Sequence, residues 1–121
     1  MAGGSLLMVE PKMRKAAFLR DVIRQLDLEN TSVEAGRFEE LLAWPELHEA
    51  FDVLTVRALR VEKSVLRGLQ TFVKPNGQLF LFKGGAGDDS AGIDPPLVWH
   101  ATYPLVESLR SRLVVLNKFV S

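Results

Sequence analysis

Residues 51–56 read FDVLTV and residues 78–82 read QLFLF, and the chain around these two stretches decides the fold. Both are short runs of apolar and β-branched residues, which are typical of buried strands. Apolar residues recur at helical spacing between them and predict an amphipathic helix: Val61, Val65, Leu69, Phe72 and Val73. Pro75-Asn76-Gly77 predicts a turn after this helix. A strand, a helix and a second strand in this order favour an α/β fold with a mainly parallel sheet.

The same alternation continues toward the N-terminus. Strands are predicted at Ser5–Glu10 and Thr31–Ala35, and an amphipathic helix that starts at Pro11 separates them. A short helical segment, Phe38–Leu42, is ended by Pro45. This part of the chain therefore supplies two more strands to the sheet.

Downstream of the fourth strand, the predicted pattern changes. Residues 84–96 are rich in Gly, Asp and Pro and predict a loop. Leu97–Tyr103 and Arg112–Phe119 follow as two closing strands, and the short turn between them predicts antiparallel pairing.

Length and composition limit the classes of protein that fit. A chain of 121 residues favours one domain, residues 1–121. It contains no cysteine, which excludes disulfides, thiolate nucleophiles and iron–sulfur clusters. We find no apolar run of the ~20 residues that span a bilayer, and no signal peptide, so we expect a cytoplasmic protein without a membrane partner.

The 15 basic and 15 acidic residues balance, but they are grouped in blocks. Basic residues dominate in segments 11–24 and 57–74, and acidic residues in segment 34–52. If the two basic helices lie on one side of the molecule, they predict a surface that binds phosphates. The alternative is that these blocks are ordinary solvated helix faces.

Ligands of parallel sheets bind beyond the carboxyl ends of the strands, so the residues there are the first candidates. They are Glu10, the segment 36–39, Arg57 and Lys83. No nucleophile elbow is present, and His48 and His100 lack metal-ligand spacing, so we expect no metal site. The GGAG segment at 84–87 precedes no helix, which argues for a plain loop rather than a dinucleotide fingerprint.

Five segments together resemble the bacterial glucose-inhibited division protein B family, from about Leu6 to Lys118. They are VEPKMRKAAFLRDVIRQLDLEN (9–30), GRFEEL (36–41), FDVLTVRAL (51–59), KPNGQLFLFKG (74–84) and RLVVLNK (112–118). The resemblance implies a Rossmann-like class I methyltransferase fold and S-adenosylmethionine as cofactor. It also implies small-subunit ribosomal RNA as partner and 7-methylguanosine as product.

The resemblance also implies roles for individual residues. Glu10 would bind the ribose hydroxyls of the cofactor, and Phe38 and Glu39 would lie beside its adenine. Arg57 would pair with the methionine carboxylate or with an RNA phosphate, and Lys83 would meet RNA phosphate. The alternatives are a helix cap for Glu10, core packing for Phe38, a surface ion pair for Arg57 and a solvated side chain for Lys83. Guanine N7 has a free lone pair, so no catalytic residue is assigned.

The chain departs from the family at its beginning. It starts at the family's second strand, whereas the family has a first strand and a glycine-rich cofactor loop before it. The second and fourth strands of the family would then pair directly, or another chain would fill the gap, or the chain is a fragment. We therefore expect a truncated domain that binds S-adenosylmethionine weakly or not at all (Kd above about 100 μM) and that forms a homo-oligomer or needs a missing N-terminal segment.

Two function classes follow from the resemblance and the departure. The first is an incomplete or divergent ribosomal RNA guanine methyltransferase, and activity of this chain alone is in question. The second is a non-catalytic remnant that binds a nucleotide, RNA or protein through the same edge of the sheet.

Overall fold

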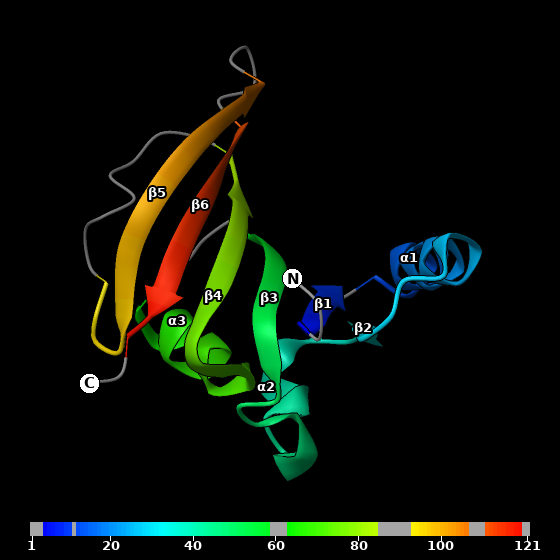
Figure 1. Ribbon diagram of the computed structural model, residues 1–121, viewed down its shortest axis with the longest axis horizontal. Helices are drawn as coiled ribbons and strands as arrows, with labels where there is room; N and C mark the ends of the chain where they lie inside the picture. The colour runs from blue at the N-terminus through cyan, green and yellow to red at the C-terminus, as the bar shows by residue number, and fades with distance from the viewer. Residues whose placement is uncertain (1–3, 11, 59–62, 85–92, 107–110, 120–121) are drawn as a thin grey trace.

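A computed structural model of the chain describes residues 4–10, 12–58, 63–84, 93–106 and 111–119 (Figure 1). Six strands form one sheet in the order β2-β1-β3-β4-β6-β5. Their bounds are β1 Leu6–Glu10, β2 Thr31–Ala35, β3 Phe51–Ala58, β4 Val73–Lys83, β5 Leu97–Val106 and β6 Ser111–Lys118. Neighbours from β2 to β4 are parallel, whereas β6 runs antiparallel to both β4 and β5. The predicted α/β fold and its antiparallel closing pair are confirmed.

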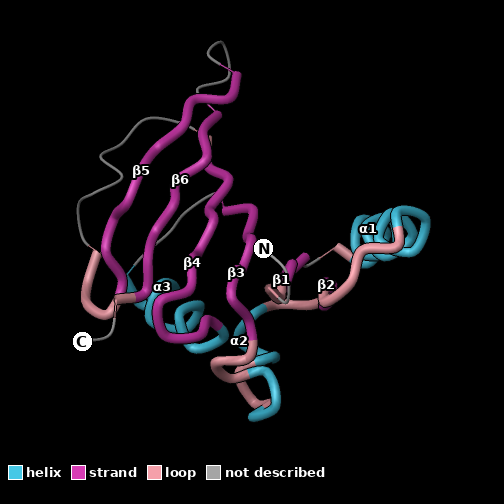
Figure 2. Tube along the Cα trace, in the orientation of Figure 1, coloured by secondary structure: helices cyan, strands magenta, loops and turns pink. Residues whose placement is uncertain are grey.

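In the part of the chain that the structure describes, three α-helices and two short 3-10 helices connect the strands. They are α1 Met13–Leu26, α2 Phe38–Leu41, η1 Pro45–Leu47, α3 Lys63–Leu69 and η2 Gln70–Phe72. In Figure 2, α2 and α3 lie close to β3 and β4, whereas α1 lies apart beside β1 and β2. Within the described ranges, no helix is long and apolar enough to cross a membrane.

The first and third strands pair directly. Leu7 of β1 lies opposite Leu54 of β3, and Met8 lies opposite Thr55, with no shift of register. This is the first of the three arrangements that the sequence left open. Because the two strands satisfy each other, open edges at this seam no longer argue for a homo-oligomer, and the oligomeric state stays a prediction.

The hydrophobic core lies between the sheet and the layer of α2 and α3. Parallel strands covered by helices are buried and read as apolar runs, as β1 and β3 do. Alternate residues of each strand point into this layer, and Leu7, Leu54 and Leu79 are fully buried there. Leu66 and Leu69 of α3 supply part of the opposing surface.

The other side of the sheet, which we call the α1 face, is covered at one end only. Val33 of β2 is buried beneath α1, and Ala16 of α1 is buried against the sheet. Arg20 of the same helix donates hydrogen bonds of 3.0 and 3.3 Å to the Val33 carbonyl. Since α3 lies on the opposite side of the sheet, the two basic helices do not share one side. The prediction of one phosphate-binding surface formed by both basic helices is therefore wrong.

The end of α1 is capped by a residue other than glycine. Asp27 adopts the left-handed conformation with φ 52°. The amide of Leu28 donates to the Ile23 carbonyl at 3.0 Å, and that of Asp27 to the Arg24 carbonyl at 3.3 Å. These bonds satisfy the last carbonyls of the helix in the usual way of a left-handed cap. The chain then turns into β2.

The segment before β4 differs from the sequence prediction in its boundary. The helix ends at Leu69 and Val73 begins the strand, opposite Phe51. The next paired residues are Val53 and Gln78, so the predicted turn at 75–77 is an outward excursion inside β4. Asn76 has φ 69° within this excursion. Its Pro-Asn-Gly signal was correct, but it interrupts a strand instead of preceding one.

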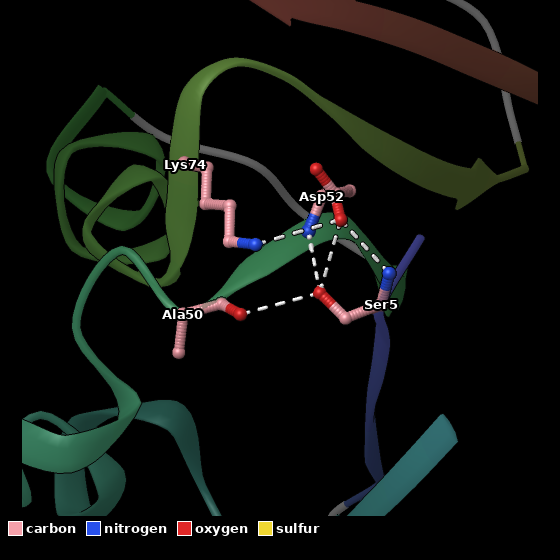
Figure 3. Close-up of polar contacts among 4 residues, drawn as sticks. All are labelled: Ser5, Ala50, Asp52 and Lys74. Carbon is pink, nitrogen blue, oxygen red and sulfur yellow. Dashed lines mark hydrogen bonds and ion pairs between the residues drawn. The ribbon is translucent and has the colours of Figure 1, made fainter. Parts of the chain in front are cut away.

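Ser5 and Asp52 join the amino ends of β1 and β3 (Figure 3). The Ser5 amide donates to Asp52 Oδ2 at 2.8 Å, and the Asp52 amide donates to Ser5 Oγ at 3.1 Å. The Ser5 hydroxyl donates to the Ala50 carbonyl at 3.2 Å, and Lys74 Nζ lies 3.7 Å from Asp52 Oδ2. The Ser5 amide, more than Lys74, holds the pKa of Asp52 below its ordinary value.

A buried lysine lies at the same edge of the sheet, at the end of the antiparallel strand β6. Lys118 is only 6% exposed, and its Nζ donates to the carbonyls of Gln70 and Val73 at 3.0 and 2.8 Å. Burial lowers its pKa, and Glu49 partly offsets this effect. We call this end of the molecule, with Ser5, Asp52 and Lys118, the amino edge, and the opposite end the carboxyl edge.

Candidate functional site

Three of the predicted strand ends meet at the carboxyl edge. Glu10 ends β1 and lies opposite Ala35 of β2, and the Gly36 amide donates to the Glu10 carbonyl at 3.1 Å. Arg57 follows Val56, whose partner is the residue before Glu10. Segment 36–39, Glu10 and Arg57 are thus brought to one edge, as the parallel topology predicted.

Glu10 is 9% exposed, which is low for a carboxylate at the end of a strand. Its Oε1 accepts a hydrogen bond of 3.2 Å from the amide of Lys12, the residue that precedes α1. Glu10 therefore helps to orient the start of the helix, as the alternative interpretation expected. A carboxylate has about four acceptor positions, so this single bond leaves capacity for ribose hydroxyls.

Arg57 is exposed next to Glu10 in the register. Among the described residues, no ion pair within 4.0 Å joins its guanidinium to Glu10. The two side chains carry opposite charges and lie on neighbouring strands, yet they form no ion pair with each other. Both line one hollow.

Phe38 and Glu39 lie at the start of α2, directly after β2. Phe38 packs against the core, and a Cβ added at Gly68 of α3 would lie 2.5 Å from its ring. The Phe38 ring thus occupies the space that the glycine leaves, and it does not line the hollow with Glu10. Glu39 is exposed. Contact of these residues with a cofactor stays a prediction, and the packing of Phe38 gives the main chain there a fixed position.

Lys83 is the last residue of β4 and is half-buried. It lies opposite Ala58 of β3 and Arg112 of β6. This places it at the carboxyl edge but outside the hollow formed by Glu10 and Arg57.

The hollow has a volume of about 430 Å³ and lies between α1 and the ends of β1 and β3. This size falls within the ~300–1,000 Å³ range of small-molecule sites. Beyond Glu10 and Arg57, its main side chains are Met8, Thr55, Lys15, Phe18, Leu19 and Phe82. Sequence reasoning missed these six. Strand alternation could have indicated Met8 and Thr55, because they lie two residues before Glu10 and Arg57 on the same strands.

This arrangement fits an amphipathic ligand that carries hydroxyl groups and charge. Glu10 accepts hydrogen bonds, Arg57 and Lys15 provide positive charge, and the remaining walls are largely apolar. No group of three or more His, Cys, Asp or Glu residues that could hold a metal ion occurs in the described part of the chain.

Solved structures with the same architecture include methyltransferases. A putative methyltransferase from Escherichia coli, yhhF, has a TM-score of 0.68 and 9% identity, covering 98% of this chain and 64% of its own. A mutant of MtNAS, solved in complex with S-adenosylmethionine, has a TM-score of 0.57 and 15% identity, covering 98% and 56%. These likenesses show the fold alone: the chain has a class I methyltransferase fold, with its candidate site at the carboxyl edge.

The sequence comparison identifies the family. The model of the GidB family, rRNA small subunit methyltransferase G, matches residues 3–93. The ribosomal RNA small subunit methyltransferase G of Leuconostoc citreum is 35% identical over 83 residues, which are 69% of this chain and 35% of that relative. The chain belongs to the GidB family and spans about a third of this relative's length. The resemblance seen in the sequence is confirmed.

Proposed function

We propose that the chain contributes the ribose-, base- and RNA-facing part of an S-adenosylmethionine-dependent methyltransferase that modifies guanine N7 in small-subunit ribosomal RNA. Membership of the GidB family supports the reaction class. The observation that carries the assignment to this edge is the juxtaposition of Glu10 and Arg57 around one hollow. A cytoplasmic location follows from this substrate.

The residues present fit the nucleoside part of the cofactor. Glu10 would accept the two ribose hydroxyls, as acidic residues at strand ends do in dinucleotide-binding folds. Phe38 and Glu39 would hold the adenine through the main chain that the Phe38–Gly68 contact fixes. Arg57 would pair with the methionine carboxylate or an RNA phosphate, and Lys83 with a phosphate at the rim.

S-adenosylmethionine supplies an electrophilic sulfonium methyl group, which guanine N7 accepts with its lone pair. Because N7 carries no proton, this chain needs no general base at the site. Its residues would contribute by positioning: Glu10 and the segment 36–39 would fix the cofactor, Lys83 would fix the RNA, and Arg57 would fix one of these two reactants. Orientation of two reactants alone is worth several kcal/mol, roughly 7–11 in the best cases.

A chimera tests this function. The 83 residues of this chain that match the Leuconostoc citreum relative would replace the matching segment of that relative, and methyl transfer to an unmodified small-subunit RNA transcript would be measured. We expect 7-methylguanosine in the product, detected by borohydride and aniline cleavage, and a loss of transfer on Glu10→Ala or Arg57→Ala. A folded chimera that binds the RNA but transfers no methyl group would contradict the proposal.

The direct pairing of β1 with β3 favours a second candidate, a non-catalytic module that binds a nucleotide or RNA. Such a module needs a continuous sheet without a gap and an accessible carboxyl edge, and both are present. Methyl transfer by the 121-residue chain on its own would exclude this candidate. Binding of RNA by the chain, together with a Kd for S-adenosylmethionine above about 100 μM, would support it.

A further inference from the structure

One row of side chains crosses the α1 face of the sheet at the carboxyl edge. Arg57 of β3 lies opposite Phe82 of β4, Phe82 opposite Leu113 of β6, and Leu113 opposite Tyr103 of β5. Glu10 of β1 stands next to Arg57 at the other end. In-register residues of neighbouring strands point to the same face, so the row continues from the hollow to the edge strand.

The two aromatic side chains of this row are exposed. Phe82 is 39% exposed and Tyr103 is 51% exposed, and half-buried Leu113 lies between them. Phe82 also lines the hollow, beside Arg57. Single exposed apolar residues need no explanation, but here two aromatics lie in one row with the proposed cofactor residues.

We propose that Phe82 is the surface on which a nucleobase of the RNA substrate stacks, with Tyr103 as a second stacking surface. This inference rests on the proposed function and names the residues that position its substrate. Single-stranded RNA is commonly bound by unstacked bases placed on aromatic side chains of an exposed sheet. Stacking tolerates any base, because every base has a π face.

The charges next to Phe82 favour RNA over an apolar partner. Arg57 occupies the neighbouring position on β3, and Lys15 of α1 lines the same hollow. A guanidinium beside a stacked base is well placed to pair with a phosphate of the same strand. Phe82 and Tyr103 are two strand spacings apart, about 10 Å, so they would contact different nucleotides.

The row also gives an order to the site. Glu10 lies at one end, where the ribose of the cofactor is proposed, and Phe82 lies two strands away. A base on Phe82 would therefore be beside the cofactor and not in its place. Phe82 acts here as a positioning residue that holds the acceptor near the methyl donor.

The experiment measures binding of a fluorescein-labelled seven-nucleotide RNA with one central guanosine, by fluorescence anisotropy at low salt, to the full 121-residue chain. We expect Phe82→Ala to raise the Kd about tenfold, and Phe82→Trp to restore it. Tyr103→Ala should raise the Kd by a smaller factor. Phe119→Ala is the matched control, because Phe119 is 64% exposed but follows β6 at the amino edge, and we expect no change.

If Phe82→Ala and the wild type bind the RNA with equal affinity and have the same melting temperature, the stacking role of Phe82 is wrong, although the chain still binds RNA. If the wild type at millimolar protein concentration does not bind the RNA, the stacking role is wrong as well. If light scattering then showed that Phe82→Ala abolishes self-association, the row would be a protein interface instead. Failure of methyl transfer in the chimera, with Phe82-dependent RNA binding intact, would reject the proposed reaction and leave this inference standing.

Discussion

The two edges of the sheet use polar residues in opposite ways. At the amino edge, Ser5 and Asp52 bond to each other, and Lys118 bonds to two carbonyls. At the carboxyl edge, Glu10 and Arg57 lie side by side without an ion pair between them, and both line a hollow. Polar groups that satisfy one another stabilise a fold, whereas groups directed at a hollow remain available for a ligand. Stability and function are therefore separated along the same strands.

The largest expected difference between the edges comes from two glycines. A Cβ at Gly77 would lie 2.7 Å from the Asp52 carbonyl oxygen and 2.9 Å from that of Lys74, whereas one at Gly84 meets nothing within 4 Å. Gly77→Ala should lower the free energy of unfolding by about 3 kcal/mol, because main-chain atoms cannot move aside. Gly84→Ala should change it by less than about 0.5 kcal/mol. Urea denaturation of both variants checks this, and equal effects would remove the contrast between the edges.

Lys118→Met should have the next largest effect. The methionine side chain replaces the apolar stem of the lysine but leaves the carbonyls of Gln70 and Val73 without their charged donor. We expect a loss of about 2 kcal/mol in the free energy of unfolding at pH 7.

The pH dependence of this loss has a defined sign. Burial lowers the pKa of Lys118 in the folded state below 10.5, so between these two values the unfolded chain binds more protons. The free energy of unfolding of the wild type therefore rises with pH up to about 10.5 because of Lys118, and Lys118→Met does not show this rise. The difference between the two proteins should be larger at about pH 10 than at about pH 7, and a smaller difference would contradict the buried position of the amine.

Asp52→Asn should lower the melting temperature at pH 7 by less than Gly77→Ala does. The pKa of Asp52 is lowered from 3.8, mainly by the Ser5 amide, so its stabilisation is present above that pH. The stabilisation is lost as the pH falls through the lower folded value, and the melting curves of wild type and Asp52→Asn should then converge. Asp21→Asn is the control, since Asp21 pairs with Arg24 on the exposed surface of α1. A gap for Asp52→Asn that persists in acid would contradict the Ser5–Asp52 pairing.

Arg57→Ala should have the smallest effect on folding, less than about 0.5 kcal/mol, because the side chain is exposed. Its effect should appear in ligand binding, with about a tenfold weaker Kd for S-adenosylhomocysteine or RNA. Arg57→Lys should recover part of the affinity, because lysine keeps the charge but not the bidentate geometry. A melting temperature several degrees below wild type, with unchanged affinity for every ligand, would show that Arg57 is structural.

The sequence predicted the strands and their order of appearance because apolar runs and their spacing are local signals. The start of β4 was placed too late, since Val73 suits a helix face as well as a strand and only its pairing with Phe51 decides. The basic blocks were visible, but which side of the sheet each helix covers depends on crossover geometry that no local pattern contains.

The candidate site was predicted in part for the same reason. Strand ends identify Glu10 and Arg57, and parallel topology places them together. Phe82 was missed because its role depends on register with Arg57 across two strands. The Ser5–Asp52 pairing was also missed, since the two residues are 47 positions apart and neither belongs to a motif.

We infer that the carboxyl edge, and not the amino edge, holds a nucleoside ligand. Titration of the ¹⁵N-labelled chain with S-adenosylhomocysteine up to millimolar concentration tests this inference most directly, because amide shifts report weak binding residue by residue. We expect shifts at Glu10, at residues 36–39 and at Arg57, with Ser5, Asp52 and Lys118 unchanged. Shifts centred on the amino edge, or none at millimolar ligand, would contradict it.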